Sequence, residues 1–529
     1  MKNLYRTFFF ILFLPILFNA QTLDWVKQYH KSALTYGNSV CVDKVGNVYV
    51  AGMYENDWAN HQMPAVGTFL RKYNSEGNLL WSKNYDNIGI AQVALDNNDC
   101  PWLTGNYVKN ANFGGITYTY TNSGNSGGYY AKFDSSGNIL AFKDFNGQAK
   151  ALNFDAQGNF YITGTFGGTL TLDGINLYNN NWLQTQAVYM FIAKFNSSGA
   201  CLWAKQSQGW LVISSFYVDN KGTSYIGGHF LGQLTLGSST ITNVGDTNGF
   251  VAKYDSAGNC NWVQNIGTAA MSTSGAGQEE INSVSADSSG NVYASGWYDG
   301  DLIIRGFYLG NGGNYGGKGF LAKFNKNGIC VDVKQPNYVV KIIDNTMFKC
   351  GNVSVPGVYD NVNLNAGTYI MKCDTSGKGL WAYQPVTSIG GILNTDKKGN
   401  IYLTGSFYGT ADFGGTTITG YNDMFVAKIS PPKDVSVREI KKNENDLNFS
   451  IYPNPTGNIF TLLYSGTKTD IEIKINVIDA LGKTVYTETI TAFTGSLKKE
   501  INLSGISKGT YFIKLSSQEF IETKKIVVE

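Results

Sequence analysis

Residues 43–52 read DKVGNVYVAG, and the pattern Asp-x-x-Gly-Asn-x-Tyr-x-x-Gly returns at regular intervals along most of the chain. Clear copies begin at Asp155, Asp287 and Asp396, and looser copies involve Asp96, Asp219 and Asp344. In each copy, short runs of β-branched and aromatic residues flank a glycine that can supply the positive φ of a hairpin turn. The pattern therefore predicts a β-hairpin at each copy.

A second motif alternates with the first and reads FLRKYNSEGNLLW at residues 69–81. Its general form is Phe-x-Ala-Lys-aromatic-Asn/Asp-x-x-Gly-Asn-x-x-Trp, and its lysine recurs as Lys72, Lys132, Lys194, Lys253, Lys323, Lys372 and Lys428. Seven copies of each motif give a repeat of about 59 residues. Two hairpins per repeat predict a four-stranded sheet, and such sheets at a fixed period are typical of a β-propeller. We predict an all-β fold with a seven-bladed β-propeller over residues 21–430.

The two ends of the repeat array complement each other. The last copy of the second motif stops at MFVAKIS, residues 424–430, and lacks its final strand. The stretch LDWVKQY at residues 23–29 matches that missing strand, with Trp25 at the tryptophan position. A strand from the start of the chain that completes the last blade removes an open sheet edge. We therefore predict that residues 23–29 close the propeller and that Trp25 lies beside Val426.

Both motifs resemble the bacterial β-propeller repeats of the SBBP type, over nearly all of residues 21–430. The resemblance implies the fold and leaves the activity open, because propellers host many unrelated functions. We interpret the repeated lysines and aspartates as architectural, since a feature present in every unit usually serves the fold. One carboxylate per turn is fewer oxygen ligands than a calcium loop uses, so neither a metal nor another cofactor is predicted.

The character of the sequence changes after residue 430. A charged linker that begins with two prolines spans residues 431–446, and alternating runs in residues 447–529 predict about seven strands of a small antiparallel β-sandwich. This segment resembles the type A C-terminal sorting domain of the type IX secretion system. The resemblance rests on Tyr452, Pro453, Asn454, Pro455, Gly457, Asp479, Gly482, Lys483, Gly509, Tyr511, Lys524 and Lys525. It implies passage through the periplasm, the type IX machinery and its sorting peptidase as partners, and a secreted or outer-surface product.

The first 20 residues predict export. Lys2 and Arg6 precede an apolar run from Phe8 to Phe18, and Ala20 supplies a small residue at the expected cleavage point. This arrangement is typical of a secretory signal peptide, and its apolar run is too short for a comfortable membrane span. We therefore predict a signal peptide over residues 1–20 and no transmembrane span in the mature chain.

Charge and residue counts exclude several functions. Without Lys2 and Arg6 the chain has 39 basic and 39 acidic residues, which gives no electrostatic reason to expect nucleic acid as a partner. A sialidase-like propeller needs three arginines, whereas residues 21–430 contain only Arg71 and Arg305. The three histidines are far apart in sequence, so no Ser-His-Asp arrangement is indicated and no catalytic residue is predicted.

Each repeat is longer than a propeller blade requires, and the extra residues differ between repeats, as binding loops do. They are rich in Asn, Gly and aromatic residues, whose rings stack on sugar faces and whose amides bind hydroxyl groups. The candidate ligand-binding residues are Trp58, Trp182, Trp210, Trp297, Tyr298, Asp299 and Asp301. Aromatic rings also pack between blades, and we expect this of the repeat tryptophans Trp81, Trp203, Trp262 and Trp381.

Binding is the function that the sequence favours. We expect an extracellular binding or adhesion module, with a polysaccharide or a matrix protein as its partner. One alternative is a glycan-acting enzyme in which acids such as Glu279 and Glu280, or Asp299 and Asp301, meet in the channel. Adjacent acids in glycine-rich loops are more often solvated turns, which weighs against this alternative. The other alternative is a purely structural surface protein.

Overall fold

The structure is a computed structural model, and every regular element in the residues that it describes is a strand. The structure describes residues 22–32, 34–55, 66–108, 110–119, 126–180, 188–267, 278–310, 318–335, 338–343, 346–353, 355–360, 362–374, 378–384, 390–431, 448–479, 483–517 and 521–529. The chain divides into two compact units, Met1–Lys433 and Asp434–Glu529. Within the described ranges, no helix has the length and apolar character needed to cross a membrane.

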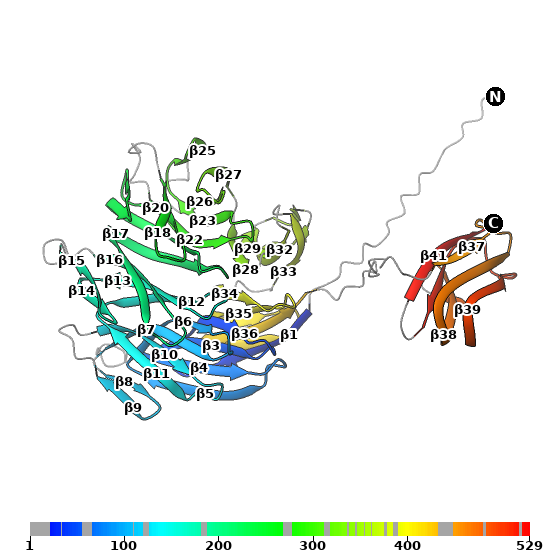
Figure 1. The fold of residues 1–529 in the computed structure, drawn as a ribbon, viewed down its shortest axis with the longest axis horizontal. Coiled ribbons are helices and arrows are strands. Elements are labelled where there is room, and N and C mark those ends of the chain that lie inside the picture. The colour runs from blue at the N-terminus through cyan, green and yellow to red at the C-terminus, as the bar shows by residue number, and fades with distance from the viewer. Residues whose placement is uncertain are drawn as a thin grey trace. The chain divides into compact units, whose positions relative to one another are not determined.

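The first unit is a β-propeller built from antiparallel four-stranded sheets (Figure 1). In chain order, the first two sheets contain β2 (Leu34–Val42), β3 (Val48–Glu55), β4 (Val66–Tyr73) and β5 (Leu79–Asp86), and then β6 (Ile88–Leu95), β7 (Pro101–Val108), β10 (Ser126–Phe133) and β11 (Ile139–Phe145). The next two sheets share β17 (Cys201–Val218): it follows β12 (Gln148–Phe154), β13 (Phe160–Phe166) and β16 (Tyr189–Phe195) in one, and precedes β18 (Ser224–Leu236), β20 (Asn248–Tyr254) and β21 (Cys260–Ile266) in the other. The remaining sheets contain β22 (Glu279–Ala286), β23 (Val292–Tyr298), β26 (Lys318–Phe324) and β27 (Cys330–Lys334); β28 (Tyr338–Ile343), β29 (Thr346–Val353), β32 (Gly367–Cys373) and β33 (Gly379–Tyr383); and β34 (Gly390–Thr395), β35 (Ile401–Asp412), β36 (Thr417–Ser430) and β1 (Thr22–Tyr29). Strand β17 is continuous through two neighbouring sheets and joins them into one hydrogen-bonded sheet. The number of seven blades therefore stays a prediction.

The Asp-x-x-Gly-Asn motif forms a turn that its own side chains close. Oδ1 of Asp43 accepts the backbone N–H groups of Val45 and Asn47 at 3.1 and 2.7 Å. Oδ2 of Asp43 accepts the side-chain amide of Asn47 at 2.7 Å. Gly46 has a φ of 93°, a conformation that glycine adopts without steric cost. The predicted hairpin is confirmed here, and the two repeated polar residues serve the turn.

A tryptophan at the end of the second motif connects one blade to a turn of the next. The ring nitrogen donates to a backbone carbonyl, and the ring covers the glycine of that turn. A Cβ atom on Gly77, for example, would come within 2.6 Å of the ring of Trp25. We call this contact the tryptophan clasp. It joins Trp25 to Ser75, Trp81 to Ser135, Trp203 to Ser256 and Trp262 to Lys326, with Nε1···O distances of 3.0, 3.0, 3.1 and 3.3 Å.

The repeated lysine lies over the aromatic ring of the first motif in its own blade. Nζ of Lys72 is 4.8 Å from the ring centroid of Tyr49, and Nζ of Lys132 is 5.4 Å from that of Trp102. Lys132 also forms an ion pair with Asp96 at 3.0 Å. These contacts confirm the interpretation of the lysines as architectural.

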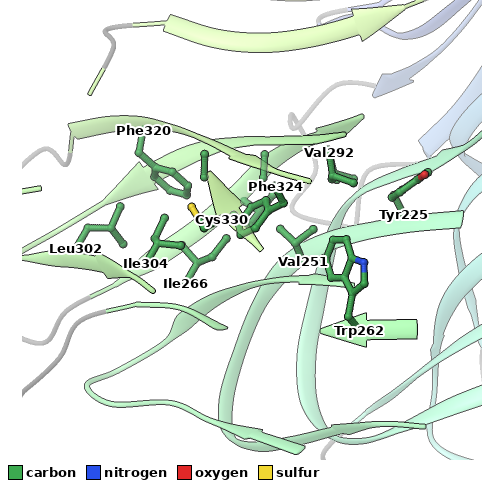
Figure 2. Packing of buried hydrophobic residues seen from close by; sticks show 14 of the residues in the cluster. Tyr225, Val251, Trp262, Ile266, Val292, Leu302, Ile304, Phe320, Phe324 and Cys330 are labelled. Atoms are coloured by element: carbon green, nitrogen blue, oxygen red, sulfur yellow. The ribbon is translucent and has the colours of Figure 1, made fainter. Parts of the chain in front are cut away.

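The buried apolar clusters of the propeller lie between neighbouring sheets. Figure 2 shows one of them, in which Tyr225 and Val251 of the β17–β21 sheet pack with Phe320 of the β22–β27 sheet. Another joins the last sheet to the first through Trp25 and Phe69. Since each cluster needs two sheets, the sheets are stable only as neighbours in the ring.

Strand β1, from the start of the chain, pairs antiparallel with β36 (Figure 1). In this pairing Trp25 faces Lys428, so the prediction that it lies beside Val426 is wrong by two residues. The same register occurs in another blade, where Trp81 faces the repeated lysine Lys72. The position opposite this lysine is therefore the one from which the tryptophan forms the clasp.

In five of the repeats, part of the extra sequence that the structure describes forms a small two-stranded hairpin beside the blade. These hairpins contain β8 (Asn110–Phe113) and β9 (Ile116–Thr119), β14 (Gly168–Leu172) and β15 (Ile175–Asn179), the end of β18 with β19 (Ser239–Thr242), β24 (Leu302–Ile304) and β25 (Phe307–Leu309), and β30 (Gly357–Tyr359) and β31 (Val362–Leu364). Asp173 and Gly174 turn one of them with positive φ values of 47° and 83°, as a type I′ turn requires. Asp173 also pairs with Lys143 of the preceding sheet at 2.7 Å. These contacts give this hairpin a structural role, whereas ligand binding by the extra residues stays a prediction.

The second unit contains β37 (Asn448–Tyr452), β38 (Ile459–Asp479), β39 (Thr484–Asn502), β40 (Gly509–Ser516) and β41 (Ile521–Val528). About seven strands were predicted, whereas the described residues form five, because two pairs of predicted runs merge into β38 and β39. Phe460 and Ile475, from the two halves of β38, lie in the same buried cluster. The long strand therefore folds over this cluster, as a sandwich requires.

Replacing Trp25 with Phe should remove the clasp hydrogen bond to Ser75 and keep most of the buried ring. We expect a loss of about 1 kcal/mol in the free energy of unfolding. Trp262→Phe should cost a similar amount, because its bond to Lys326 is equivalent. Urea denaturation of the three proteins measures both losses. Unfolding midpoints equal to the wild type in both variants would contradict the clasp.

Candidate functional site

Five side chains come together at the junction of the β17–β21 and β22–β27 sheets. Trp210 and Ser214 lie on β17, His229 on β18, Glu280 on β22 and Trp297 on β23. Glu280 is near the start of β22 and Trp297 near the end of β23, which are the strand ends away from the turn that joins them. We call this group the Trp210–Trp297 cluster. No single repeat contains it.

Glu280 is the centre of the cluster. Oγ of Ser214 donates to its Oε1 at 3.0 Å, and Nε1 of Trp297 donates to its Oε2 at 3.1 Å. Nδ1 of His229 lies 3.9 Å from Oε1, and the rings of His229 and Trp210 are 5.8 Å apart between centroids. The side chain of Glu280 is 28% exposed. Each carboxylate oxygen can therefore accept a further hydrogen bond from a ligand.

His229 adds polarity to the cluster without adding a cation. Burial lowers the pKa of His229, and the nearby Glu280 opposes that effect only in part. The imidazole is therefore neutral at neutral pH. Its Nδ1 atom is buried and has no hydrogen-bond partner in the described part of the chain. The imidazole thus lies beside Glu280 without adding a positive charge.

The structure brings together two of the predicted ligand-binding residues, Trp210 and Trp297, which are 87 positions apart in sequence. Both residues are half-buried, so each keeps part of its surface accessible. Trp58 and Trp182 lie outside the described residues.

Tyr298, a third predicted residue, is fully buried. Its hydroxyl donates to the carbonyl of Gly310 at 3.2 Å and accepts from Nε2 of Gln335 at 2.8 Å. Its ring belongs to a buried apolar cluster and lies 6.3 Å from the ring of Phe320, centroid to centroid. The prediction that Tyr298 stacks on a ligand is therefore wrong.

Asp299 and Asp301 interact with groups outside the Trp210–Trp297 cluster. The backbone N–H of Asp299 donates to the carbonyl of Gln278 at 2.9 Å, and its carboxylate contributes to the field at Glu279. Asp301 is exposed, and its charge raises the pKa of the exposed Tyr308. Neither aspartate has a hydrogen bond or ion pair with Glu280 among the described residues.

Glu279 and Glu280 lie on a strand, not in the solvated turn that the sequence suggested, and they point to opposite sides of it. Glu279 is fully buried, and neither carboxylate oxygen has a hydrogen-bond partner in the described structure. Burial, together with the charge of Asp299, raises the pKa of Glu279 to about 9. Its carboxyl group is therefore protonated at neutral pH.

Sequence reasoning did not select Ser214 or His229 as members of a site, and it named Glu280 only together with Glu279, in the alternative of a glycan-acting enzyme. A comparison of the repeats offers a signal for His229, because it occupies the same repeat position as Trp297, directly after the last glycine of the first motif. The other sheets have Met53, Asn106, Thr165, Asn352 and Ser406 at this position. A position that changes in every blade is not dictated by the fold and is free to serve a ligand.

In the second unit, the Tyr-Pro-Asn-Pro motif holds the last strand. Nδ2 of Asn454 donates to the carbonyl of Lys525 at 2.8 Å, and Oδ1 of Asn454 accepts the N–H of Val527 at 2.9 Å. The Tyr452–Pro453 and Asn454–Pro455 peptide bonds are cis. Gly457 follows the motif and has open space around its Cα. The motif and the end of the chain thus form one structural group.

The remaining predicted sorting residues close turns and strand ends. Oδ1 of Asp479 accepts the N–H of Lys483 at 2.9 Å, whereas Gly482 lies outside the described residues. Gly509 begins β40, and the hydroxyl of Tyr511 donates to the carbonyl of Ser507 at 2.6 Å. Nζ of Lys524 lies 5.1 Å from the ring centroid of Phe449.

Two family models match the chain. Residues 450–529 match the secretion system C-terminal sorting domain, and residues 24–53 match the SBBP beta-propeller repeat. The chain therefore carries a type IX sorting domain and an SBBP repeat, which confirms both resemblances. The sorting domain makes this a secreted or cell-surface protein that interacts with the type IX secretion machinery.

Individual relatives are distant. A WD repeat-containing protein of Acanthamoeba polyphaga mimivirus, named as uncharacterized, is 23% identical over 310 residues, which cover 53% of this chain and 19% of that protein. The chain thus spans about a fifth of that relative's length. A mutant apocarotenoid oxygenase of Synechocystis has a TM-score of 0.36 at 9% identity and covers 77% of this chain and 94% of its own. A member of the DUF4221 family from Bacteroides vulgatus has a TM-score of 0.27 at 9% identity, over 63% and 92% of the two chains. Likeness at this level identifies no function.

The raised pKa of Glu279 should make stability depend on pH. In the unfolded chain the residue ionises near its ordinary value of 4.5, whereas in the folded protein it stays protonated up to about pH 9. The free energy of unfolding should therefore fall as pH rises between these values, by about 1.4 kcal/mol per pH unit. Glu279→Gln should remove this loss, so the stability of the variant relative to the wild type should increase from pH 5 to pH 9. Urea denaturation at several pH values measures the gain, with the exposed Glu76→Gln as control. Parallel pH profiles for Glu279→Gln and the wild type would contradict the assignment.

Proposed function

We propose that the protein is an extracellular binding module that holds a polysaccharide on the Trp210–Trp297 cluster. The observation that carries this proposal is the meeting of two half-exposed indole rings, from two sheets, around the carboxylate of Glu280. Indole rings stack on the apolar faces of sugars, and carboxylate oxygens accept hydrogen bonds from sugar hydroxyl groups. Both kinds of contact are available here at one place.

The polar neighbours of Glu280 support the same function. Ser214 is exposed, and the side chain of Glu280 is partly exposed. A ring with several hydroxyl groups can bond both side chains while its face lies on an indole. The cluster also contains two residues of the variable repeat position, His229 and Trp297. Ligand contacts with these residues leave the turns and clasps unchanged.

Hydrolysis of a glycan has less support in the described residues. A glycosidase needs two carboxyl groups on the two sides of the scissile bond. Glu280 lies in the cluster, but Glu279 points to the other side of β22 and is buried. The cluster as described therefore supports binding and adhesion.

We propose the following route for the chain. Residues 1–20 direct export into the periplasm as a signal peptide, residues 21–430 form the propeller, residues 431–446 form the linker, and residues 447–529 are read by the type IX machinery and its sorting peptidase. The propeller then works outside the cell, where it attaches to a polysaccharide or to a polysaccharide-rich matrix.

Alanine variants test the proposal. Trp210→Ala and Trp297→Ala should each weaken binding to a polysaccharide by roughly tenfold, because each removes one stacking surface. Tyr408→Ala is the control, since Tyr408 is 65% exposed on another sheet and has no contact with the cluster. A glycan array followed by calorimetry measures the affinities. Unchanged affinity in both tryptophan variants, or a folded wild type that binds no polysaccharide, would contradict the proposal.

A further inference from the structure

The Trp210–Trp297 cluster contains a carboxylate and no cation to balance it. The two groups that donate to Glu280, Ser214 and Trp297, are neutral, and His229 is neutral because burial lowers its pKa. Glu280 has no ion pair with a lysine or arginine among the residues that the structure describes. Its negative charge is therefore available to a ligand.

We infer that the cluster recognises a protonated amine, so that its ligand is a glycan built from amino sugars with free amino groups. This inference rests on the proposed function and narrows its ligand class. An ammonium group forms stronger hydrogen bonds to a carboxylate than a hydroxyl group does, and it is also attracted to the face of an indole ring. Glu280 and the two tryptophans supply both partners within one cluster.

The same charge argues against other glycans. A uronic acid or a sulfated sugar would bring a second negative charge next to Glu280, at the cost of repulsion in a partly buried site. A neutral sugar would stack on Trp210 and Trp297 but leave the charge of Glu280 unbalanced. An amino sugar satisfies the rings and the charge together.

The polar atoms around Glu280 favour a sugar over the lysine side chain of a protein. A lysine carries the same ammonium group on a flexible chain, which has no further polar atoms beside the charge. A sugar ring also presents hydroxyl groups, which can bond the exposed Oγ of Ser214 and the second oxygen of Glu280. The cluster offers more polar partners than a lysine can use.

Three hexasaccharides with the same β-1,4-linked backbone provide the test. They are the hexamers of glucose, N-acetylglucosamine and glucosamine, which in mildly acidic buffer, where the sugar amine is protonated, place a hydroxyl, a neutral amide and an ammonium group at the same carbon. Calorimetry on the full-length protein should give at least roughly tenfold tighter binding to the glucosamine hexamer. That preference should shrink as salt is added, whereas binding of the glucose hexamer should change little.

Glu280→Gln should abolish most of the preference, so that the three hexamers bind within about threefold of one another. Glu76→Gln, an exposed acid on the β2–β5 sheet, should retain the full preference. The salt dependence of the wild type gives an independent reading if Glu280→Gln does not fold.

The outcomes separate the two proposals. Equal binding of the three hexamers by the wild type would overturn the amine inference and leave polysaccharide binding intact. Tighter binding of hexalysine than of the glucosamine hexamer would overturn the choice of a glycan. Failure to bind any hexamer or array polysaccharide would overturn the proposed function itself.

Discussion

The hydrogen bond from an indole N–H of one blade to a turn carbonyl of the next is the interaction on which the rest of the propeller depends. A four-stranded sheet of this size cannot bury both of its faces alone, and the apolar clusters accordingly lie between sheets. Neighbouring sheets must therefore stay at a fixed position relative to each other. At four of the described junctions the clasp does this directly, because the ring covers the turn glycine and leaves no room for a side chain there. Where the last sheet of the propeller meets the first, Trp25 of β1 makes the same contact with the turn at Ser75. Strand β1 therefore closes the ring without a covalent link.

The same repeat explains where a ligand can bind. Aspartate, asparagine, glycine, lysine and tryptophan have fixed tasks in turns and clasps, and they recur at fixed positions of the two motifs. The position after the last glycine of the first motif has no such task and differs from blade to blade. Where two such positions meet, at His229 and Trp297, Glu280 joins them. Repetition thus sets the frame, and departure from repetition produces the candidate site.

The sequence predicted most of the frame, because hairpin turns, repeat length and strand pairing depend on local patterns. The register of β1 was wrong by two residues, since nothing in the local pattern shows that a tryptophan must face the repeated lysine. The site was harder to predict. Trp210 and Trp297 were selected for exposure and composition, but their meeting depends on contacts between sheets. Tyr298 was selected for the same reasons and is buried, because its neighbour in the alternation of β23 is the residue that faces the site. Glu279 and Glu280 look equivalent in sequence, and only the strand shows that one is buried and the other is not.

Hydrogen exchange on strand β1 tests the central claim, that the ring is closed by the start of the chain. The matched reference is β11, which is the outer strand of the β6–β11 sheet and is connected to its partner β10 by a turn. If β1 is a full member of the ring, its amides that bond to β36 should exchange as slowly as the corresponding amides of β11. Fast exchange throughout β1, with slow exchange in β11 and β36, would show a ring that holds together without its closing strand and would contradict this account.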